Sequence, residues 1–524
     1  MTTASDPTVS TPTPPPATRY LVLIGAIIVQ LILGTVYGYS IFWQPLESEL
    51  GLEETKATYA FSICILSFAA VMVIAGRVQD VKGPRFPTIV GACLMGAGFI
   101  LASFMNQPFV LYLAHAAFVG AVAIVLLMLF HALMGKADPE SNPIVQYVPW
   151  GIVAAAVTAG VMFGNQYVGK LGEFDQLFLL WGTVGFLAGA GIGFAYVCPI
   201  AALVKWFPRH KGLMAGIAVA GFGFGAFVFA HKDLPFSAEN YIKDYGITNL
   251  FLIHGVVSLV AMIAGAMLLR NPPTASAAPA ASAAKPIVDS SWQQALLRPG
   301  FWVLWLMFFS GAMAGLMVIG ILKPFAGDQL LGAAQAGGQW VTQTLTETKA
   351  ALGGEYQAWL ADFQSEEAAA KRWILNKGAQ AVGWLAIFNA VGRIVWGMAS
   401  DRIGRTAAFV AMFVFQAAML AMLGTLQTEL SLAVGASIIG FNYGGLFALF
   451  PSATADLFGS KNLGAIYGWV FTSYGIAGVV GIAAWNAAKE HASPTTALYI
   501  AAVLCLISAG LAIGLGLAQK RAVA

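Results

Sequence analysis

Long apolar runs recur along almost the whole length of this 524-residue sequence, and they constrain its fold more than any other feature. Many of them reach about 18 residues, enough for a helix to cross roughly 30 Å of hydrocarbon. Hydrophobic residues make up 59% of the chain and charged residues only 10%, a composition foreign to soluble globular proteins. The sequence therefore predicts an all-α polytopic membrane protein.

The runs form two halves with a different composition between them. Residues 19–270 hold eight predicted spans, and residues 299–524 hold six, which gives fourteen in all. An Ala-, Pro- and Ser-rich stretch at 271–298 is typical of a flexible linker, which we place in the cytoplasm. The Thr- and Pro-rich residues 1–18 have no basic segment before an apolar one, so we expect a disordered cytoplasmic tail and no signal peptide.

Basic residues predict the orientation. With the N-terminus inside, sixteen of the 27 Lys and Arg residues fall in inner loops and tails and ten in outer ones. Four of those ten lie in the outer loop 325–377, and long loops carry little weight in the positive-inside rule. We therefore expect both termini in the cytoplasm, and a location in the inner (plasma) membrane.

The outer loop 325–377 is unusually long. Its segment Thr342–Leu375 is rich in Ala, Glu, Gln and Lys, which favours an amphipathic helix on the outer face. A surface cap, a gate and a partner site are all compatible with this pattern.

One charge is left over after the loops are assigned. Arg393 is the only formally charged side chain that falls deep inside a predicted span. A charge near the bilayer centre costs about 2.5–3.5 kcal/mol even on the lenient insertion scale. An uncompensated cation there suggests a site that holds an anion, although Arg393 could instead extend to the cytoplasmic surface or bond backbone carbonyls. Asp401 is eight residues away, or about 12 Å along a helix, which is near the limit of such reach.

A short motif occurs in both halves, each time in a short predicted cytoplasmic loop. Its pattern is G-x-x-x-D-x-x-G followed by Arg, and the two copies start at Gly76 and at Gly397. Gly lets two helices approach closely, and Asp can cap the next helix N-terminus while pairing with Arg. We expect conformational roles for its residues, which are Gly76, Asp80, Gly83, Arg85, Gly397, Asp401, Gly404 and Arg405.

A second pair of segments repeats in the same order, with Pro199 before Trp206 and Gly212 in the first half, and Pro451 before Phe458 and Gly464 in the second. Two parallel halves joined by a linker resemble the major facilitator superfamily, in which the substrate site lies near the midplane between the halves. An inserted helix pair at 108–168 departs from the twelve spans of that fold, but an even insertion preserves the topology.

The finer pattern resembles the oxalate/formate antiporter family, which is related to the monocarboxylate transporters. Four stretches carry this resemblance: Gly34–Phe42, Tyr196–Pro208, Phe388–Gly397 and Leu449–Asp456. The resemblance covers the twelve core spans. It implies a secondary transporter that moves a small carboxylate by alternating access, as a monocarboxylate of the formate, lactate or pyruvate type or by oxalate/formate exchange.

The resemblance also implies site residues. Arg393 matches the arginine that binds the substrate carboxylate in this family, and its planar fork suits bidentate binding. Oxalate-carrying members have a second cation where this chain has Tyr474, which favours a monocarboxylate, because an unpaired second carboxylate is costly to bury. Aromatic residues are expected to wall the site, although each could equally serve ordinary packing: Tyr37, Tyr196, Phe222, Tyr443, Phe447, Phe471 and Tyr474.

Asn389 lies one turn before Arg393, where proton-coupled monocarboxylate transporters, which resemble this segment, carry Asp. Asn cannot titrate, so we include it in the site and expect exchange or facilitated diffusion. His115, His131 and His254 lie in or near spans and could titrate, but structural roles are expected for them.

Other functions lack their sequence signatures. No phosphate-loop motif is present, and no cluster of His, Asp, Glu or Cys suggests catalysis, so we expect no enzyme, cofactor, metal or nucleic-acid partner. The four cysteines lie in apolar spans without metal-ligand spacing. The expected partners are a small carboxylate anion and the lipid bilayer, and we expect a monomer. A non-transporting carboxylate sensor on the same scaffold is the alternative.

Overall fold

The computed structural model describes residues 17–105, 151, 154–155, 158, 173–230, 237–273 and 289–523, and these residues are mostly helical. The predicted all-α membrane class is confirmed, since twelve helices in this part of the chain are long and apolar enough to span a bilayer. The predicted pair at 108–168 lies almost wholly outside the described residues. The count of fourteen spans therefore stays a prediction.

The two halves share one pattern of long helices with short turns. The first half contains α1 (Ala17–Gly34), η1 (Thr35–Phe42), α2 (Trp43–Leu50), α3 (Glu54–Lys82), α4 (Arg85–Ala102), α7 (Glu173–Leu180), η2 (Trp181–Leu187), α8 (Ala188–Trp206), α9 (Lys211–Ala230), α10 (Ala238–Tyr245) and α11 (Ile247–Leu268). The second contains α12 (Trp292–Leu296), α13 (Pro299–Ala336), α14 (Trp340–Leu352), η4 (Gly353–Glu355), α15 (Tyr356–Ala361), α16 (Glu366–Lys377), α17 (Ala379–Ile403), α18 (Arg405–Leu423), α19 (Glu429–Phe458), α20 (Leu463–His491) and α21 (Pro494–Val523).

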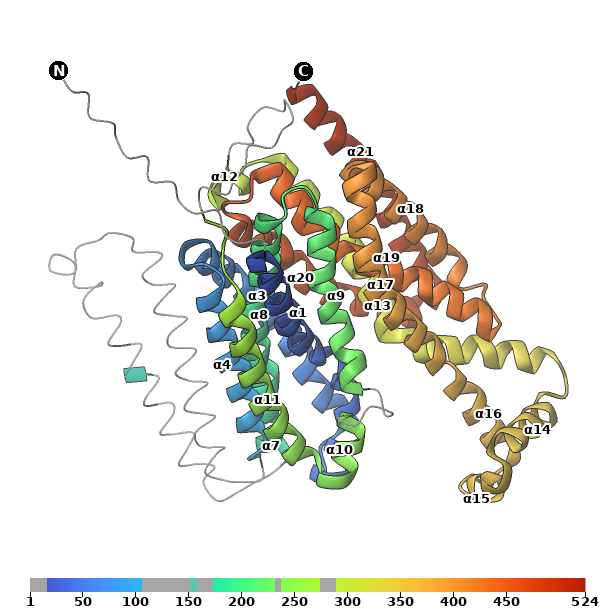
Figure 1. The fold of residues 1–524 in the computed structure, drawn as a ribbon. Coiled ribbons are helices and arrows are strands. Elements are labelled where there is room, and N and C mark those ends of the chain that lie inside the picture. The colour runs from blue at the N-terminus through green and yellow to red at the C-terminus, as the bar shows by residue number, and fades with distance from the viewer. Residues whose placement is uncertain are drawn as a thin grey trace, which may run out of the picture.

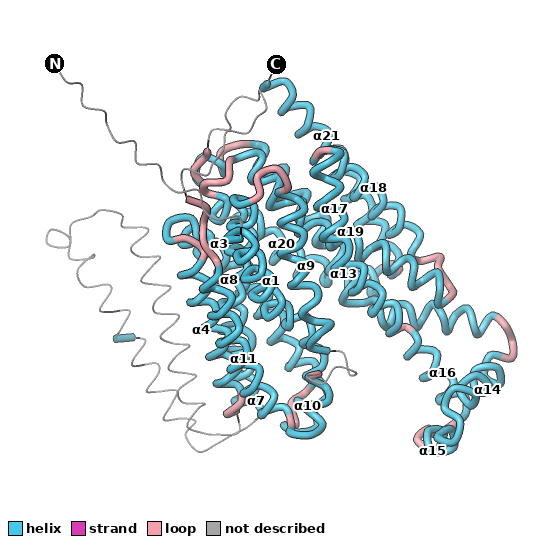
Figure 2. Tube along the Cα trace, in the orientation of Figure 1, coloured by secondary structure: helices cyan, strands magenta, loops and turns pink. Residues whose placement is uncertain are grey.

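The halves lie side by side, the first from blue to green and the second from yellow to red in Figure 1. Helices α3 and α9 of the first half pack against α20 and α17 of the second. Figure 2 shows helix almost throughout, with turns gathered at the ends of the bundle. The end that carries the α3–α4 and α17–α18 turns, and with them both Asp motifs, is termed the motif end.

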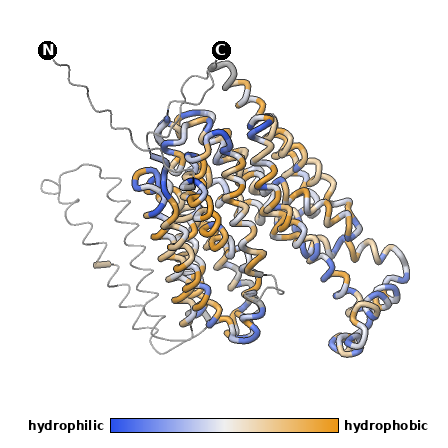
Figure 3. Tube along the Cα trace, viewed as in Figure 1, coloured by the Kyte–Doolittle hydropathy of each residue, from blue (hydrophilic) through white to orange (hydrophobic). Residues whose placement is uncertain are grey.

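The long helices are mostly hydrophobic in colour in Figure 3, and many of their large apolar side chains are exposed on the outside of the bundle. Val260, Phe415 and Val479 are each about 60% exposed (62%, 59% and 62%), although they are large and hydrophobic. In water such a surface would aggregate, whereas in a bilayer it meets lipid at no cost. The polar residues Gln30, Asn389 and Arg393 are buried inside instead.

A break in the first long helix positions one residue of the predicted site. A Cβ atom on Gly34 would collide with the backbone carbonyl of Phe222, so glycine permits α1 and α9 to cross closely. The chain then tightens into the 3-10 segment η1, where the hydroxyl of Thr35 donates to the carbonyl of Ile32 at 2.7 Å. Tyr37, two residues later, points toward the second half and reaches its side chains.

Glycine contacts across the interface reveal an internal symmetry. Added Cβ atoms would make Gly212 collide with Gly397 and Gly464 collide with Gly76. The second contact repeats the first with the two halves exchanged. Helix α3 therefore corresponds to α17, and α9 corresponds to α20. Corresponding residues of α3 and α17 differ in residue number by the same step as Gly76 and Gly397. Corresponding residues of α9 and α20 differ by the same step as Gly212 and Gly464. Residues related by these two steps are termed equivalent positions.

We expected each motif aspartate to cap the helix that follows it in the chain. Each one instead caps a helix of the other half. Asp401 accepts hydrogen bonds from the backbone of Gly212 and Leu213 at the start of α9, at 3.0 and 2.8 Å. Asp80 accepts equivalent bonds from Gly464 and Ala465 at the start of α20, at 3.1 and 2.7 Å. Both carboxylates thus neutralise a helix N-terminus across the interface and hold the motif end together.

The arginines of the two motifs behave differently. Arg405 pairs with Asp401 at 2.8 Å, as expected, and also with Asp456 at 2.9 Å. Arg85 instead donates to the carbonyl of Leu269 at 2.8 Å, and no ion pair between it and Asp80 occurs among the described residues. The partner of Asp80 is Lys205, at 3.9 Å.

The remaining motif glycines form turns. Gly83 and Gly404, which are related by the same step as Gly76 and Gly397, have φ angles of 80° and 87°, which other residues rarely adopt. Each ends a long helix and turns the chain into the next. The repeat thus extends to backbone conformation.

The end of the linker is ordered onto the second half. Ser291 begins α12 with a capping box to Gln294, and Trp292 stacks on Trp469 of α20 at 6.0 Å. Asn462 donates to the carbonyl of Ser290 at 2.8 Å. Most of the predicted linker, residues 274–288, lies outside the described residues.

The long outer loop is not a single amphipathic helix, so that prediction was wrong. Helix α13 continues to Ala336, and the expected segment is divided among α14, α15 and α16 (Figure 1). Gly353, with a φ angle of 55°, breaks the first junction, and Ser365 caps the start of α16. The three helices enclose a small core around Leu345, Ala369 and Ala370 and form a separate lobe.

Candidate functional site

Arg393 lies in the middle of α17 and its side chain is fully buried. It does not extend to a surface. Its Nε donates to the amide oxygen of Asn389 at 2.9 Å, and its Nη1 donates to the carbonyl of Val219 in α9 at 2.5 Å. The guanidinium therefore contacts both halves of the bundle.

The guanidinium keeps one free donor group. Nη2 of Arg393 is buried and has no hydrogen-bond partner among the described residues, and none of their carboxylates pairs with this side chain. The ring centres of Phe447 and Phe222 lie 4.7 and 5.8 Å from Cζ, and such contacts recover only about 2 kcal/mol when desolvated. Among the described residues, the guanidinium thus remains a positive charge in an apolar setting with one donor group unused, which is costly without a partner.

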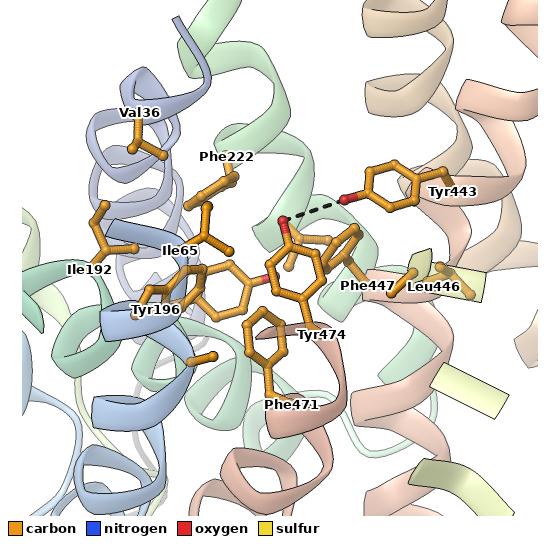
Figure 4. Packing of buried hydrophobic residues seen from close by; sticks show 14 of the residues in the cluster. Val36, Ile65, Ile192, Tyr196, Phe222, Tyr443, Leu446, Phe447, Phe471 and Tyr474 are labelled. Atoms are coloured by element: carbon orange, nitrogen blue, oxygen red, sulfur yellow. Dashed lines mark hydrogen bonds between the residues drawn. The ribbon is translucent and has the colours of Figure 1, made fainter. Parts of the chain in front are cut away.

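The predicted aromatic residues form one cluster, which meets this guanidinium through Phe222 and Phe447. Figure 4 shows the rings of Tyr196, Phe222, Phe447, Phe471 and Tyr474 converging from both halves. Tyr196 lies 5.3 Å from Phe222 and 5.4 Å from Phe471, and Phe471 lies 4.8 Å from Tyr474, all between ring centres. Phe471 and Tyr474 are spaced i,i+3, and Tyr443 and Phe447, whose ring centres lie 5.3 Å apart, are spaced i,i+4, so each pair lies on one face of its helix.

Three tyrosine hydroxyls form a chain beside these rings. The hydroxyls of Tyr37 and Tyr474 lie 2.9 Å apart, and Tyr443 donates to Tyr474 at 3.4 Å. Figure 4 shows the latter contact. The first bond links η1 to α20 and so joins the halves, and the second lies within the second half. The hydroxyl of Tyr196 is buried without a hydrogen-bond partner among the described residues, which leaves another polar group free for a ligand.

The structure brings all nine predicted site residues into one connected cluster. Their roles stay predictions, because proximity does not demonstrate binding. Sequence reasoning missed two contributors, the carbonyl of Val219 and the ring of Phe68, which lies 5.0 Å from Tyr196 and 4.9 Å from Phe471. The repeat could have revealed Phe68, since it is the equivalent position of Asn389.

Of the three histidines named above, only His254 lies among the described residues. Its Nε2 lies 3.2 Å from the hydroxyl of Thr35, and its ring packs against Phe99 and Phe229 at 4.5 and 4.7 Å. It supports the start of η1 and does not contact the cluster around Arg393. His115 and His131 lie outside the described residues.

Similar proteins include transporters, two of which are named for the carboxylates that they carry. The chain is 24% identical to an uncharacterised MFS-type transporter, YhjX, of Escherichia coli, covering 88% of this chain and 86% of that protein. It is 23% identical to the oxalate:formate antiporter of Oxalobacter formigenes, covering 94% and 90%. It is 24% identical to apicoplast pyruvate carrier 1 of Toxoplasma gondii, covering 87% and 81%.

Solved structures share the fold. The outward conformation of the transporter FucP matches with a TM-score of 0.54 at 13% identity, covering 95% of this chain and 99% of that one. The Major Facilitator Superfamily model matches residues 144–342 and 373–522, and the gap between these ranges falls within the lobe of α14, α15 and α16. From its repeated halves and from this match, the chain belongs to the Major Facilitator Superfamily of membrane transporters.

Proposed function

We propose that this transporter carries small monocarboxylate anions across the membrane by alternating access. The observation that carries the proposal is the buried guanidinium of Arg393, which has a free Nη2 and no acidic partner among the described residues. Relatives named as an oxalate:formate antiporter and a pyruvate carrier support a carboxylate substrate. A formate, lactate or pyruvate anion would supply the missing negative charge.

Charge balance favours one carboxylate. The cluster contains one cation, and Tyr474 occupies the place at which a second would be expected. A dianion such as oxalate would keep one negative charge in a setting of aromatic rings, where desolvation costs several kcal/mol (of order 3–5). A second carboxylate could be met only by hydroxyls such as those of Tyr37 and Tyr196, which are weaker partners than a cation.

Alternating access requires that the halves separate at one end and then at the other. The bond between Tyr37 and Tyr474 closes the centre, and the two Asp caps close the motif end. Basic loops favour the motif end as the cytoplasmic side, which would make this conformation one that is sealed toward the cytoplasm. Substrate would enter from the other side when the tyrosine contact opens.

Exchange without a proton gradient is the expected mode, because Asn389 keeps Arg393 in place without titrating. The variant Asn389→Asp tests this. At neutral pH its carboxylate should pair with Arg393 and displace the substrate, lowering exchange at least about tenfold. Protonation of this carboxylate would free Arg393, so exchange should recover only at acidic pH. Exchange by the parent protein should vary little over the same range.

Counterflow of labelled substrate in liposomes at several pH values would measure this profile. Asn389→Leu is the matched control, since it also loses the 2.9 Å bond but introduces no charge and should lower exchange equally at every pH. A flat profile for Asn389→Asp would show that residue 389 does not act on the substrate charge.

The function itself is tested by counterflow of labelled formate, lactate and oxalate in the absence of a proton gradient. Exchange of a monocarboxylate but not of oxalate would support the proposal as stated. Exchange of oxalate would show that the hydroxyls suffice for a second carboxylate. Saturable binding without flux would favour the sensor alternative, and neither binding nor flux of these anions would reject the proposal.

A further inference from the structure

The internal symmetry of the interface assigns an equivalent position to Arg393 in the first half, and that position is Met72. We propose that Met72 is a second specificity-determining residue of the central site and that it limits the site to substrates with a single carboxylate. The inference rests on the proposed carboxylate function. It goes further by naming the residue that faces the uncharged end of the substrate.

The register of this symmetry is fixed by contacts above and below the position. A Cβ on Gly216 would collide with the carbonyl of Arg393, and a Cβ on Gly468 would meet the carbonyl of Met72. Gly216 and Gly468 are separated by the step that relates α9 to α20. Met72 and Arg393 are separated by the step that relates α3 to α17. The backbone of Met72 therefore occupies, in its half, the place that the backbone of Arg393 occupies in the other.

The same two steps also hold further from the motif end. Gly223 approaches Ala390 at 3.5 Å, and Gly475 approaches Ala69 at 2.9 Å, measured from an added Cβ. Ala69 and Ala390 are equivalent positions, and so are the two glycines. Three successive contacts thus agree, so the pairing is not shifted by a helical turn.

The neighbours of Arg393 also have equivalents, and these lie inside the aromatic cluster. Asn389 corresponds to Phe68, and Val219 corresponds to Phe471, and the ring centres of Phe68 and Phe471 lie 4.9 Å apart. Phe222, which lies beside the guanidinium, corresponds to Tyr474, 6.5 Å from Phe68. A side chain at position 72 that follows the path of Arg393 is therefore directed at the cluster from the opposite half.

The chemistry of the two positions is opposite. Arg393 supplies a full charge, whereas Met72 is a fully buried thioether with no strong hydrogen-bonding group. A flexible thioether adapts its shape to a hydrogen atom, a methyl group or a short alkyl chain. A substrate held by its carboxylate at Arg393 would direct its other end toward Met72, where an apolar group is accepted and a second carboxylate is left unpaired.

The first test adds a cation at this position. Met72→Arg should raise the exchange of oxalate or malonate relative to formate at least about tenfold, measured by competition counterflow in liposomes. Met72→Leu, the matched apolar control, should leave this ratio within about twofold of the parent. An unchanged ratio in folded Met72→Arg protein would overturn the inference.

The second test moves the charge and leaves its number unchanged. Arg393→Met should lose binding of labelled formate, and the double variant Arg393→Met/Met72→Arg should regain at least about a tenth of it. Loss in the single variant without recovery in the double one would reject the role of Met72 and leave the proposed function standing. Undiminished formate transport by Arg393→Met would instead reject the proposed function.

A failure of the double variant to fold would also give a decisive result. The double variant buries the same single charge as the parent, so the equivalence predicts a monodisperse protein with a similar melting temperature. Failure of the double variant to fold, where Arg393→Met folds, would show that position 72 does not accept a cation and would also overturn the inference.

Discussion

Replacing Arg393 with glutamine is expected to abolish carboxylate transport while the protein remains at least as stable as the parent. Glutamine retains hydrogen-bonding capacity but loses the charge that would neutralise the substrate. Truncating one partner of a buried, hydrogen-bonded charge pair costs about 2–5 kcal/mol, so counterflow should fall at least about 100-fold. Stability should not fall in parallel, because an uncompensated buried charge disappears.

Two readouts that move in opposite directions make this test specific. Counterflow in liposomes measures transport, and thermal unfolding in detergent measures stability. Arg393→Lys is the control for charge without the planar fork, and it should show intermediate transport with weaker substrate affinity. If Arg393→Gln lost stability and transport together, the main role of Arg393 would be to join the halves through the carbonyl of Val219. Retained transport by Arg393→Gln would show that Arg393 is not part of the substrate-binding site.

Much of this architecture could be predicted because its signals are local. Apolar runs fix the spans, and the spacing of Tyr443 from Phe447 or of Phe471 from Tyr474 fixes a common helix face. The buried charge of Arg393 was visible because nothing in its own span compensates for it. The two G-x-x-x-D motifs were visible as a repeat, which led to the fold of two equivalent halves.

The parts that could not be predicted depend on contacts between distant segments. The caps of Asp80 and Asp401 were expected on the next helix, because a sequence shows neighbours in the chain and not across an interface. The carbonyl of Val219 carries no sequence signal, since every residue has one. The lobe was expected as one helix because its composition favours helix, whereas the break at Gly353 depends on a left-handed backbone conformation.

The equivalent glycines at the motif end lead to the other large expected effect. Gly464→Val and Gly212→Val should each lower the maximal transport rate at least about tenfold. In Gly464 an added Cβ would lie 2.6 Å from the carbonyl of Gly76 and 3.0 Å from the carboxylate of Asp80. In Gly212 it would lie 2.6 Å from the hydroxyl of Ser400. Valine at either site therefore keeps α3 from α20, or α17 from α9.

The size of this effect follows from the cost of overpacking. Extra carbon atoms in a tight contact cost about 1–3 kcal/mol, and each 1.4 kcal/mol changes a conformational equilibrium about tenfold. The closed motif end would be depopulated in both variants, whereas the site around Arg393 is unchanged in composition. Transport rates should therefore fall while the dissociation constant for formate changes only a few-fold, and the two variants should resemble each other because their contacts are equivalent.

The matched controls lie in α21, where Gly510 and Gly514 have no other atoms within 4 Å of an added Cβ. Gly510→Val and Gly514→Val add the same β-branched side chain to a long apolar helix and should transport at the parent rate. Counterflow rates and formate binding, measured on all four variants, distinguish a closure defect from a binding defect. Parent-like rates in Gly464→Val and Gly212→Val would mean that transport does not pass through this tightly closed motif end, because valine cannot occupy it without separating the halves.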